Sequence, residues 1–233
     1  MFRQVRGLST AVVVLVALSV LSDVVVGFGA AYAANTVTGY VNGVVGDAEL
    51  DLMTTVVTAI EYVSLTLFIA SAVVFLVWLW RVRANAESVN HTYGQRAVLW
   101  GWLPVVQLWV PRRVVLDVWR ASAPVPDLSR AAVNWWWGLW LATLVLNRVV
   151  SRMVDRAGSV DDYRNVAVAV LVVAMLDAAE GVLLVVVVQR ITGWQSAADF
   201  PPAPHPAPVQ PAEAPPRVLP PPPAPDPRWA RPE

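Results

Sequence analysis

Long apolar blocks, each bordered by charged residues, limit most strongly what this chain can fold into. Residues 8–34 are largely apolar, and residues 52–80 and 165–188 repeat the pattern. A helix of roughly 20 such residues crosses a hydrocarbon layer of about 30 Å. With 57% hydrophobic and 15% charged residues, the chain is too apolar for an ordinary soluble domain. The blocks therefore predict an all-α, polytopic membrane protein.

A fourth block, residues 134–150, is shorter and opens with aromatic residues of the kind that gather at membrane interfaces. We predict a helical bundle with four transmembrane helices, at about residues 8–34, 52–80, 134–150 and 165–188, within one membrane domain over residues 1–195. For the first block a cleaved signal peptide is the alternative, because Ala31 and Ala33 have the spacing of a cleavage site. Its apolar region exceeds the usual 7 to 15 or so residues, which favours a retained anchor.

The stretch over residues 78–122 follows neither the pattern of a span nor that of a loop. It holds six of the twelve tryptophans, six arginines, Pro104 and Pro111. Its apolar part, residues 98–110, falls short of the roughly 20 residues that a spanning helix needs. Trp102, Val106 and Trp109 recur at helical spacing, and a second short helix is predicted over residues 114–120. We predict an interfacial or re-entrant Trp/Pro-rich helical segment at about residues 98–120.

The arginine positions favour four spans. All seventeen basic residues are arginine, and four spans with both termini inside place thirteen on the cytoplasmic side and four near the outer side: Arg148, Arg152, Arg156 and Arg164. A fifth span at residues 98–120 would change the count to nine inside and eight outside. Because positive charge concentrates in cytoplasmic loops, we expect a multi-pass protein of the cell membrane with two cytoplasmic termini.

The composition changes abruptly near the C-terminus, where residues 201–233 contain fifteen of the nineteen prolines. Such a segment cannot bury a core, so we predict a disordered Pro-rich cytoplasmic tail over residues 196–233 with polyproline II character. Arg217 precedes the prolines at residues 220–223 in a pattern that aromatic grooves of partner proteins can bind. A simple tether explains the same composition.

Four groups of residues between the second predicted span and the end of the fourth share one pattern. They are Trp80, Arg81, Asn85 and Ala86; Trp100, Pro104, Leu108, Trp109 and Pro111; Trp119, Arg120, Ala121 and Ser122; and residues 135–140 with Arg190, Ile191, Thr192 and Gln195. Over about residues 55–195 the chain thereby resembles a bacterial family of multi-pass membrane proteins that carry the domain of unknown function 4328. Gln107 stands where that pattern has Asn, and Arg112 and Arg113 replace a more polar or aromatic pair. The resemblance implies a membrane fold and no assigned activity.

Charged residues inside the predicted spans form a candidate polar cluster: Asp23, Glu61, Arg148, Asp177 and Glu180. Asp23 and Glu61 lie at matching depths of roughly 14 to 17 Å, and Asp177 shares a helical face with Glu180 at i+3. Intramembrane acids usually face the bundle interior, where a base or a proton compensates them. The cluster predicts either a proton- or cation-binding site or a network with Arg148 that holds the helices in register. Four spans without internal repeats favour the second interpretation.

The arginines and tryptophans of the central stretch are the candidate lipid contacts. Arg112, Arg113 and Arg120 on an interfacial helix would face anionic headgroups, at about 1 kcal/mol each. The full set is Trp80, Arg81, Trp100, Trp102, Trp109, Arg112, Arg113, Trp119 and Arg120. Anchoring at a fixed depth is their simpler role, and specific lipid recognition is the further one.

No set of residues in the sequence points to catalysis. The absence of cysteine excludes disulfides and thiolate sites, and His91 and His205 are the only histidines. We find no phosphate loop, Ser/His/Asp set or zinc spacing, so we expect no enzyme activity, metal or cofactor, and no nucleic-acid binding. The leading hypothesis is a membrane scaffold or interaction protein that contacts lipids or protein partners. The alternative is a small transporter or channel subunit that uses the intramembrane carboxylates.

Overall fold

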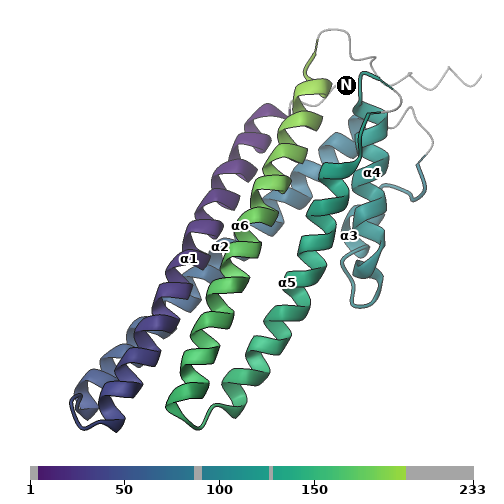
Figure 1. Ribbon diagram of the computed structural model, residues 1–233. Helices are drawn as coiled ribbons and strands as arrows, with labels where there is room; N and C mark the ends of the chain where they lie inside the picture. Colours follow the sequence, from purple (N-terminus) through teal and green to yellow (C-terminus); the bar gives the residue numbers. More distant parts are fainter. Residues whose placement is uncertain (1–4, 87–90, 126–127, 198–233) are drawn as a thin grey trace, which may run out of the picture. The chain divides into compact units, whose positions relative to one another are not determined.

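The structure is a computed structural model that describes residues 5–86, 91–125 and 128–197. Over these ranges it contains helices and no strand, which confirms the all-α prediction. The elements, shown in Figure 1, are α1 (Arg6–Val41), α2 (Asp47–Asn85), α3 (Ala97–Trp100), η1 (Val106–Leu108), α4 (Val110–Ser122), α5 (Ala131–Arg156) and α6 (Val160–Gln195). The predicted disordered tail lies outside the described residues, apart from its first two positions.

Among the described residues, three helices are long and apolar enough to cross a membrane: α1, α2 and α6, with 36, 39 and 36 residues. At 1.5 Å per residue, 36 residues extend for about 54 Å, well beyond a hydrocarbon layer of about 30 Å. The helices therefore continue through polar residues on both sides of each predicted span. Helix α5 has 26 residues and is not among the three, because its tryptophans, asparagines and arginines lower its mean hydropathy.

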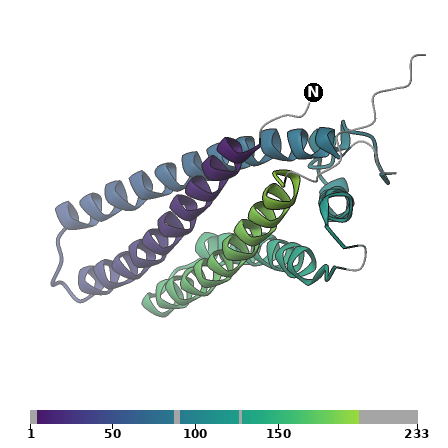
Figure 2. The same ribbon diagram turned by 90° about the horizontal axis from the view of Figure 1, so that it is seen from above.

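The long helices pack side by side in an order that differs from their order along the chain. Helix α1 packs against both α2 and α6, and α6 packs against α5. Figure 2 shows α1 between α2 and α6. Only 22% of the residues in the most apolar window of each candidate span are buried inside the protein. Most of the apolar side chains therefore face outward, as expected where lipid is the solvent.

Glycines permit the close approach of α1 and α6. A Cβ atom added to Gly27 would lie 2.8 Å from the Leu171 side chain, and one added to Gly181 would lie 2.7 Å from the Val20 side chain. Each helix thus contributes a glycine where the other contributes an aliphatic side chain. Small residues of this kind allow van der Waals packing between helices that have no hydrophobic driving force in lipid.

The central segment folds as a hairpin of short helices joined by a turn. Helix α3 ends at Trp100, a turn leads into η1, and α4 begins at Val110 with Pro111 in its first turn, a position that proline tolerates well. The predicted helical face of Trp102, Val106 and Trp109 is wrong, because the chain turns between Trp100 and Val106. Nine of the thirteen residues of α4 are buried, and six of them belong to one hydrophobic core with the ends of α2, α5 and α6.

We predict that Gly181→Leu destabilises the packing of α1 on α6 by about 1–3 kcal/mol, because the new side chain overpacks against Val16 and Val20. Gly138→Leu is the matched control, since a Cβ at Gly138 meets no atom within 4 Å. The free energy of unfolding in detergent micelles measures both variants. Equal stability of the two would show that α1 and α6 do not approach as closely as described.

Candidate functional site

Aromatic side chains from α2, α5 and the central turn form the tryptophan core, which consists of Phe75, Trp78, Trp102, Trp136, Trp137 and Trp140. Trp137 stacks on Trp140 with ring centroids 4.7 Å apart, and the Trp102 ring meets Trp140 edge-on at 5.8 Å. Trp78 and Trp136 are at most 1% exposed. Aromatic pairs in these arrangements add to the stability that burial alone provides. The core fixes the central turn against the start of α5.

A buried amide joins the central segment to the last turn of α6. Gln195 is fully buried, and its Nε2 donates to the Val82 carbonyl at 3.0 Å and to the Ser122 Oγ at 2.8 Å. Its Oε1 accepts a hydrogen bond from the Asn85 Nδ2 at 3.3 Å. These four residues form the Gln195 network, which connects α2, α4 and α6. The pattern of the sequence contained Asn85, Ser122 and Gln195 without showing that they meet.

Further interactions hold α2 and α4 against α6 at the same end. The Trp78 indole donates to the Thr192 hydroxyl at 3.1 Å, and the Trp119 ring meets the Trp194 ring edge-on at 4.7 Å. The Arg190 guanidinium lies 6.0 Å from the centre of the Trp119 ring, within cation–π range. Together with the Gln195 network, these contacts make the central segment part of the folded helix bundle.

The arginines of α4 are bound to neighbours as well as exposed to the surroundings. Arg112 donates to the Asn134 side chain at 2.8 Å, and Arg113 donates to the Tyr93 hydroxyl at 3.2 Å. Arg120 lies 3.7 Å from Asp117, whose other carboxylate oxygen accepts the backbone N–H of Thr92 at 2.8 Å. Their predicted role as lipid contacts therefore applies only to the parts of these arginine side chains that remain exposed beside the hydrogen bonds.

The predicted tryptophan contacts separate into two groups. Trp100 and Trp109 are 40% and 43% exposed, as contact with lipid requires. Trp80 and Trp102 are half-buried, and Arg81 is half-buried beside them. Trp119 is 1% exposed, so the structure gives it a packing role in place of the predicted lipid contact.

The turn between α3 and α4 presents an apolar tip, formed by Leu99, Leu103, Val105 and Leu108. These side chains are 44–66% exposed. The Val106 N–H donates to the Pro104 carbonyl at 2.9 Å, and Val105 has φ +70° and ψ −54°. This is the rare and strained form of the γ-turn, with a β-branched residue at positive φ. Such strain persists only where the surrounding structure imposes it, and here the Trp102 side chain fixes the turn.

Polar side chains inside the bundle come from all four long helices. Ser64 donates to the Asp23 carboxylate at 3.1 Å, and Thr143 donates to the Glu180 carboxylate at 3.5 Å. Asp177 lies close enough to Asp23 and Glu180 to interact with both electrostatically. These three acids form the carboxylate cluster. The buried Trp136 N–H has no partner at hydrogen-bond distance among the described residues, and it is directed toward Glu180.

The other two members of the predicted polar cluster do not join it. Glu61 and Arg148 are both exposed on the sides of their helices. Asp23 meets Ser64, one turn further along α2 than Glu61. The predicted network between Arg148 and the carboxylates is therefore absent from the part of the chain that the structure describes.

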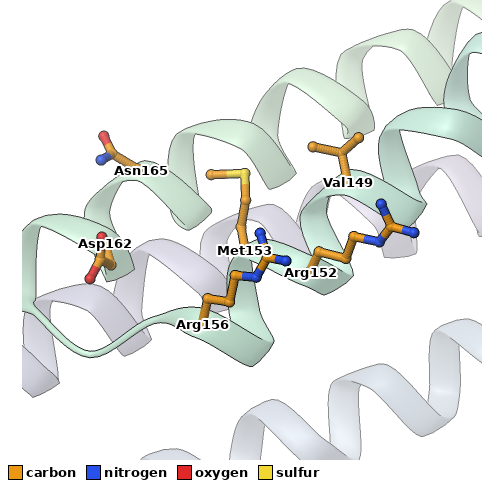
Figure 3. Close-up of a pocket in the computed structure, with 6 residues that line it drawn as sticks. All are labelled: Val149, Arg152, Met153, Arg156, Asp162 and Asn165. Carbon is orange, nitrogen blue, oxygen red and sulfur yellow. The ribbon is translucent and has the colours of Figure 1, made fainter.

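A cavity of about 400 Å³ lies between α5 and α6 near the loop that joins them. Figure 3 shows Arg152, Met153 and Arg156 projecting from α5, with Asp162 and Asn165 on α6. The Asp162 carboxylate accepts hydrogen bonds from the Ser159 hydroxyl and backbone, at 2.7 and 3.0 Å, in a capping box that begins α6. Within the described residues Arg152 and Arg156 form no salt bridge, so both guanidinium groups are available to an anion.

A second cavity of about 400 Å³ lies between the start of α1 and the end of α6. Its polar lining includes Arg6, Ser9, Gln189, Thr192 and Ser196. The sequence did not show that these residues meet, because they lie far apart in the chain and only Thr192 belongs to the pattern described above. Neither cavity has a metal-binding set, since the described residues contain no group of three His, Cys, Asp or Glu that could hold an ion.

Comparison with known proteins identifies the family. A model of the domain of unknown function DUF4328 matches residues 41–193. The chain belongs to the DUF4328 family. Neither the curated proteins nor the solved structures gave a match. The predicted resemblance is therefore confirmed, and the DUF4328 region contains the tryptophan core, α3, α4 and α5.

The DUF4328 match begins at Val41, the last residue of α1. It therefore leaves out Asp23 and nearly all of the helix that packs between α2 and α6. It includes Asn85 and Ser122 of the Gln195 network and ends two residues before Gln195 itself. Of the carboxylate cluster, Asp177 and Glu180 lie within it.

Gln195→Leu is expected to reduce the free energy of unfolding by about 3 kcal/mol, because it removes the three buried hydrogen bonds that Gln195 makes with Asn85, Ser122 and Val82. Gln189→Leu, at an exposed position on the same helix, should change stability by less than about 0.5 kcal/mol. Denaturation by sodium dodecyl sulfate, followed by tryptophan fluorescence, measures both. A Gln195→Leu variant as stable as Gln189→Leu would contradict the described network.

Proposed function

We propose that the protein is a non-enzymatic membrane scaffold with four spans and two cytoplasmic termini. In this proposal α5 is the fourth span, and the segment over residues 97–122 is a re-entrant hairpin that enters the inner leaflet. The hairpin contacts lipid, and the surfaces around it, together with the Pro-rich tail, bind protein partners at the cell membrane. The observation that carries the proposal is the apolar tip, held in a strained turn on a tightly packed base.

The arrangement of polar and apolar groups on the hairpin supports lipid contact. Apolar side chains occupy the tip, whereas Arg96, Arg113 and Arg120 are exposed on either side of it. Trp102 beside the tip reaches Trp140, in the third turn of α5, while Ser122 at the opposite end of α4 meets Gln195. Apolar groups at depth with arginines toward the surface match the environment of a membrane interface.

Site-directed labelling tests this placement, and the absence of native cysteine makes every introduced cysteine unique. We expect a nitroxide on Val105→Cys to be relaxed mainly by oxygen, which partitions into lipid, and one on Arg120→Cys mainly by a water-soluble nickel complex. The two positions are both exposed in the structure, so the difference reports their surroundings. Equal access of the nickel complex to both would refute insertion of the tip.

Reporter fusions test the topology separately. A reporter after Ser122 and one after Glu233 should both give a cytoplasmic signal, because the hairpin returns to the side from which it enters. If residues 98–120 crossed the membrane, both positions would instead give an external signal, and the four-span topology would fail.

Partner binding is tested by co-purification from membranes. Removal of residues 201–233 combined with Arg113→Gln and Arg120→Gln is expected to reduce the recovery of bound proteins several-fold, because both candidate binding surfaces are lost. Arg130→Gln alone, at an exposed position outside the hairpin, serves as the control. Unchanged recovery with the combined variant would argue against a scaffold.

A second function is supported by the carboxylate cluster. Half-buried acids inside a bundle, with no base beside them among the described residues, suit a site that takes up protons or cations. On this proposal the protein is a small transporter or channel subunit, and Asp177→Asn should abolish proton or cation flux into reconstituted vesicles. Absence of flux in the wild type as well as the variant would remove this candidate and leave the cluster a structural role.

A further inference from the structure

We propose that the cavity between the first turns of α1 and the last turns of α6 binds a phosphate group. The source of that group is either the headgroup of a phospholipid or free phosphate, which share the same chemistry. This proposal goes beyond the scaffold function and does not depend on the apolar tip, so either can fail alone.

The charge around the cavity favours an anion. Arg6 lines it and forms no salt bridge with another described residue, and none of the residues around it is acidic. The first turn of α1 contains no acidic residue, and no side chain caps it. The N-terminal amides of a helix carry a partial positive charge and can serve as donors to phosphate.

A hydroxyl on a largely buried residue faces the cavity. Ser9 lines the cavity and is only 6% exposed, and its Oγ makes no hydrogen bond to any described residue. The Oγ is not among the completely buried atoms that lack a partner, so it is accessible from the cavity. A phosphate oxygen in the cavity would accept the hydrogen bond that Ser9 lacks.

Other donors in the same cavity are unoccupied. The side chains of Gln189 and Ser196 line it and have no hydrogen-bond partner in the parts of α1 and α6 that the structure describes. Of the two threonines that line it, Thr10 donates to the Arg6 carbonyl at 3.1 Å, whereas Thr192 accepts from Trp78 at 3.1 Å and keeps its own O–H as a donor. A guanidinium, three hydroxyls and an amide therefore remain to match the acceptor oxygens of phosphate.

The cavity is larger than a bare phosphate, and part of its lining is apolar. Its volume of about 400 Å³ accommodates a headgroup. Val13 lines it one helical turn beyond Ser9, where the apolar part of α1 begins. A phospholipid could therefore place its phosphate at Arg6 and Ser9 and its acyl chains along α1.

The full chain is mixed in detergent with phosphatidylglycerol or with diacylglycerol. Native mass spectrometry then measures how much lipid stays bound when the detergent is removed. We expect the wild type to retain phosphatidylglycerol and not diacylglycerol, which lacks the phosphate. Arg6→Gln should weaken retention about tenfold, since it removes a charge-assisted interaction. Gly193→Leu should have a similar effect, because Gly193 lines the cavity and a Cβ there meets no atom within 4 Å, so the side chain can fill the space.

Arg130→Gln removes one exposed arginine outside the cavity and should retain lipid as the wild type does. Titration with inorganic phosphate, followed by thermal stability, identifies the source. If phosphate stabilises the wild type but neither cavity variant, and the variants retain lipid as the wild type does, the site is one for free phosphate. The proposal would be overturned if both cavity variants retained phosphatidylglycerol, and responded to phosphate, as the wild type does.

Discussion

The amide of Gln195 determines whether the central segment belongs to the bundle. A fully buried amide must find partners for its donors and its acceptor, and α6 alone offers none at its last turn. Val82 and Asn85 of α2 and Ser122 of α4 supply them. These hydrogen bonds bring together three elements that are separated by as many as 113 residues along the chain. The tryptophan core can then close beneath them, because α2, α4 and α6 are held at one end.

This construction gives the two halves of the long helices different properties. Near the Gln195 network, aromatic and aliphatic side chains are buried against other helices. Farther along, α1, α2 and α6 expose most of their apolar residues, and the interior contains the carboxylate cluster with its serine and threonine partners. A rigid end that carries an apolar tip, together with a looser polar interior, is consistent with a scaffold that is anchored in lipid. The same contrast explains why the two proposed functions arise from different parts of the molecule.

The sequence predicted the helical class, three apolar helices and the family because these depend on local composition and on short motifs. Hydropathy marks where a helix is apolar and not where it ends, so α6 continues seven residues beyond the predicted boundary at residue 188. The turn after Trp100 was missed because Trp102, Val106 and Trp109 have a spacing that a helix would also produce. Only the tertiary contacts of Trp102 show that the chain reverses there.

The candidate sites were less predictable for a related reason. The depth of each residue along its helix predicted that Asp23 and Glu61 meet. The rotation of α2 about its axis decides which of its side chains faces the interior, and in the structure Ser64, not Glu61, faces Asp23. Gln195 belonged to the sequence pattern and Ser9 did not, but neither revealed its surroundings, because an isolated amide or hydroxyl gains meaning only from the elements that bury it. The position of Asp177 and Glu180 on one face of α6 was correct, since i and i+3 always lie close on a helix.

The most direct test of this account is a double-mutant cycle between Ser122 and Gln195. Each residue is changed to alanine, alone and together, and the free energy of unfolding of all four proteins is measured in the same detergent. The account predicts a coupling energy of about 1 kcal/mol or more, as residues in one hydrogen-bond network show. Additive effects of the two substitutions would contradict it, because α4 and the end of α6 would then not be joined through this amide.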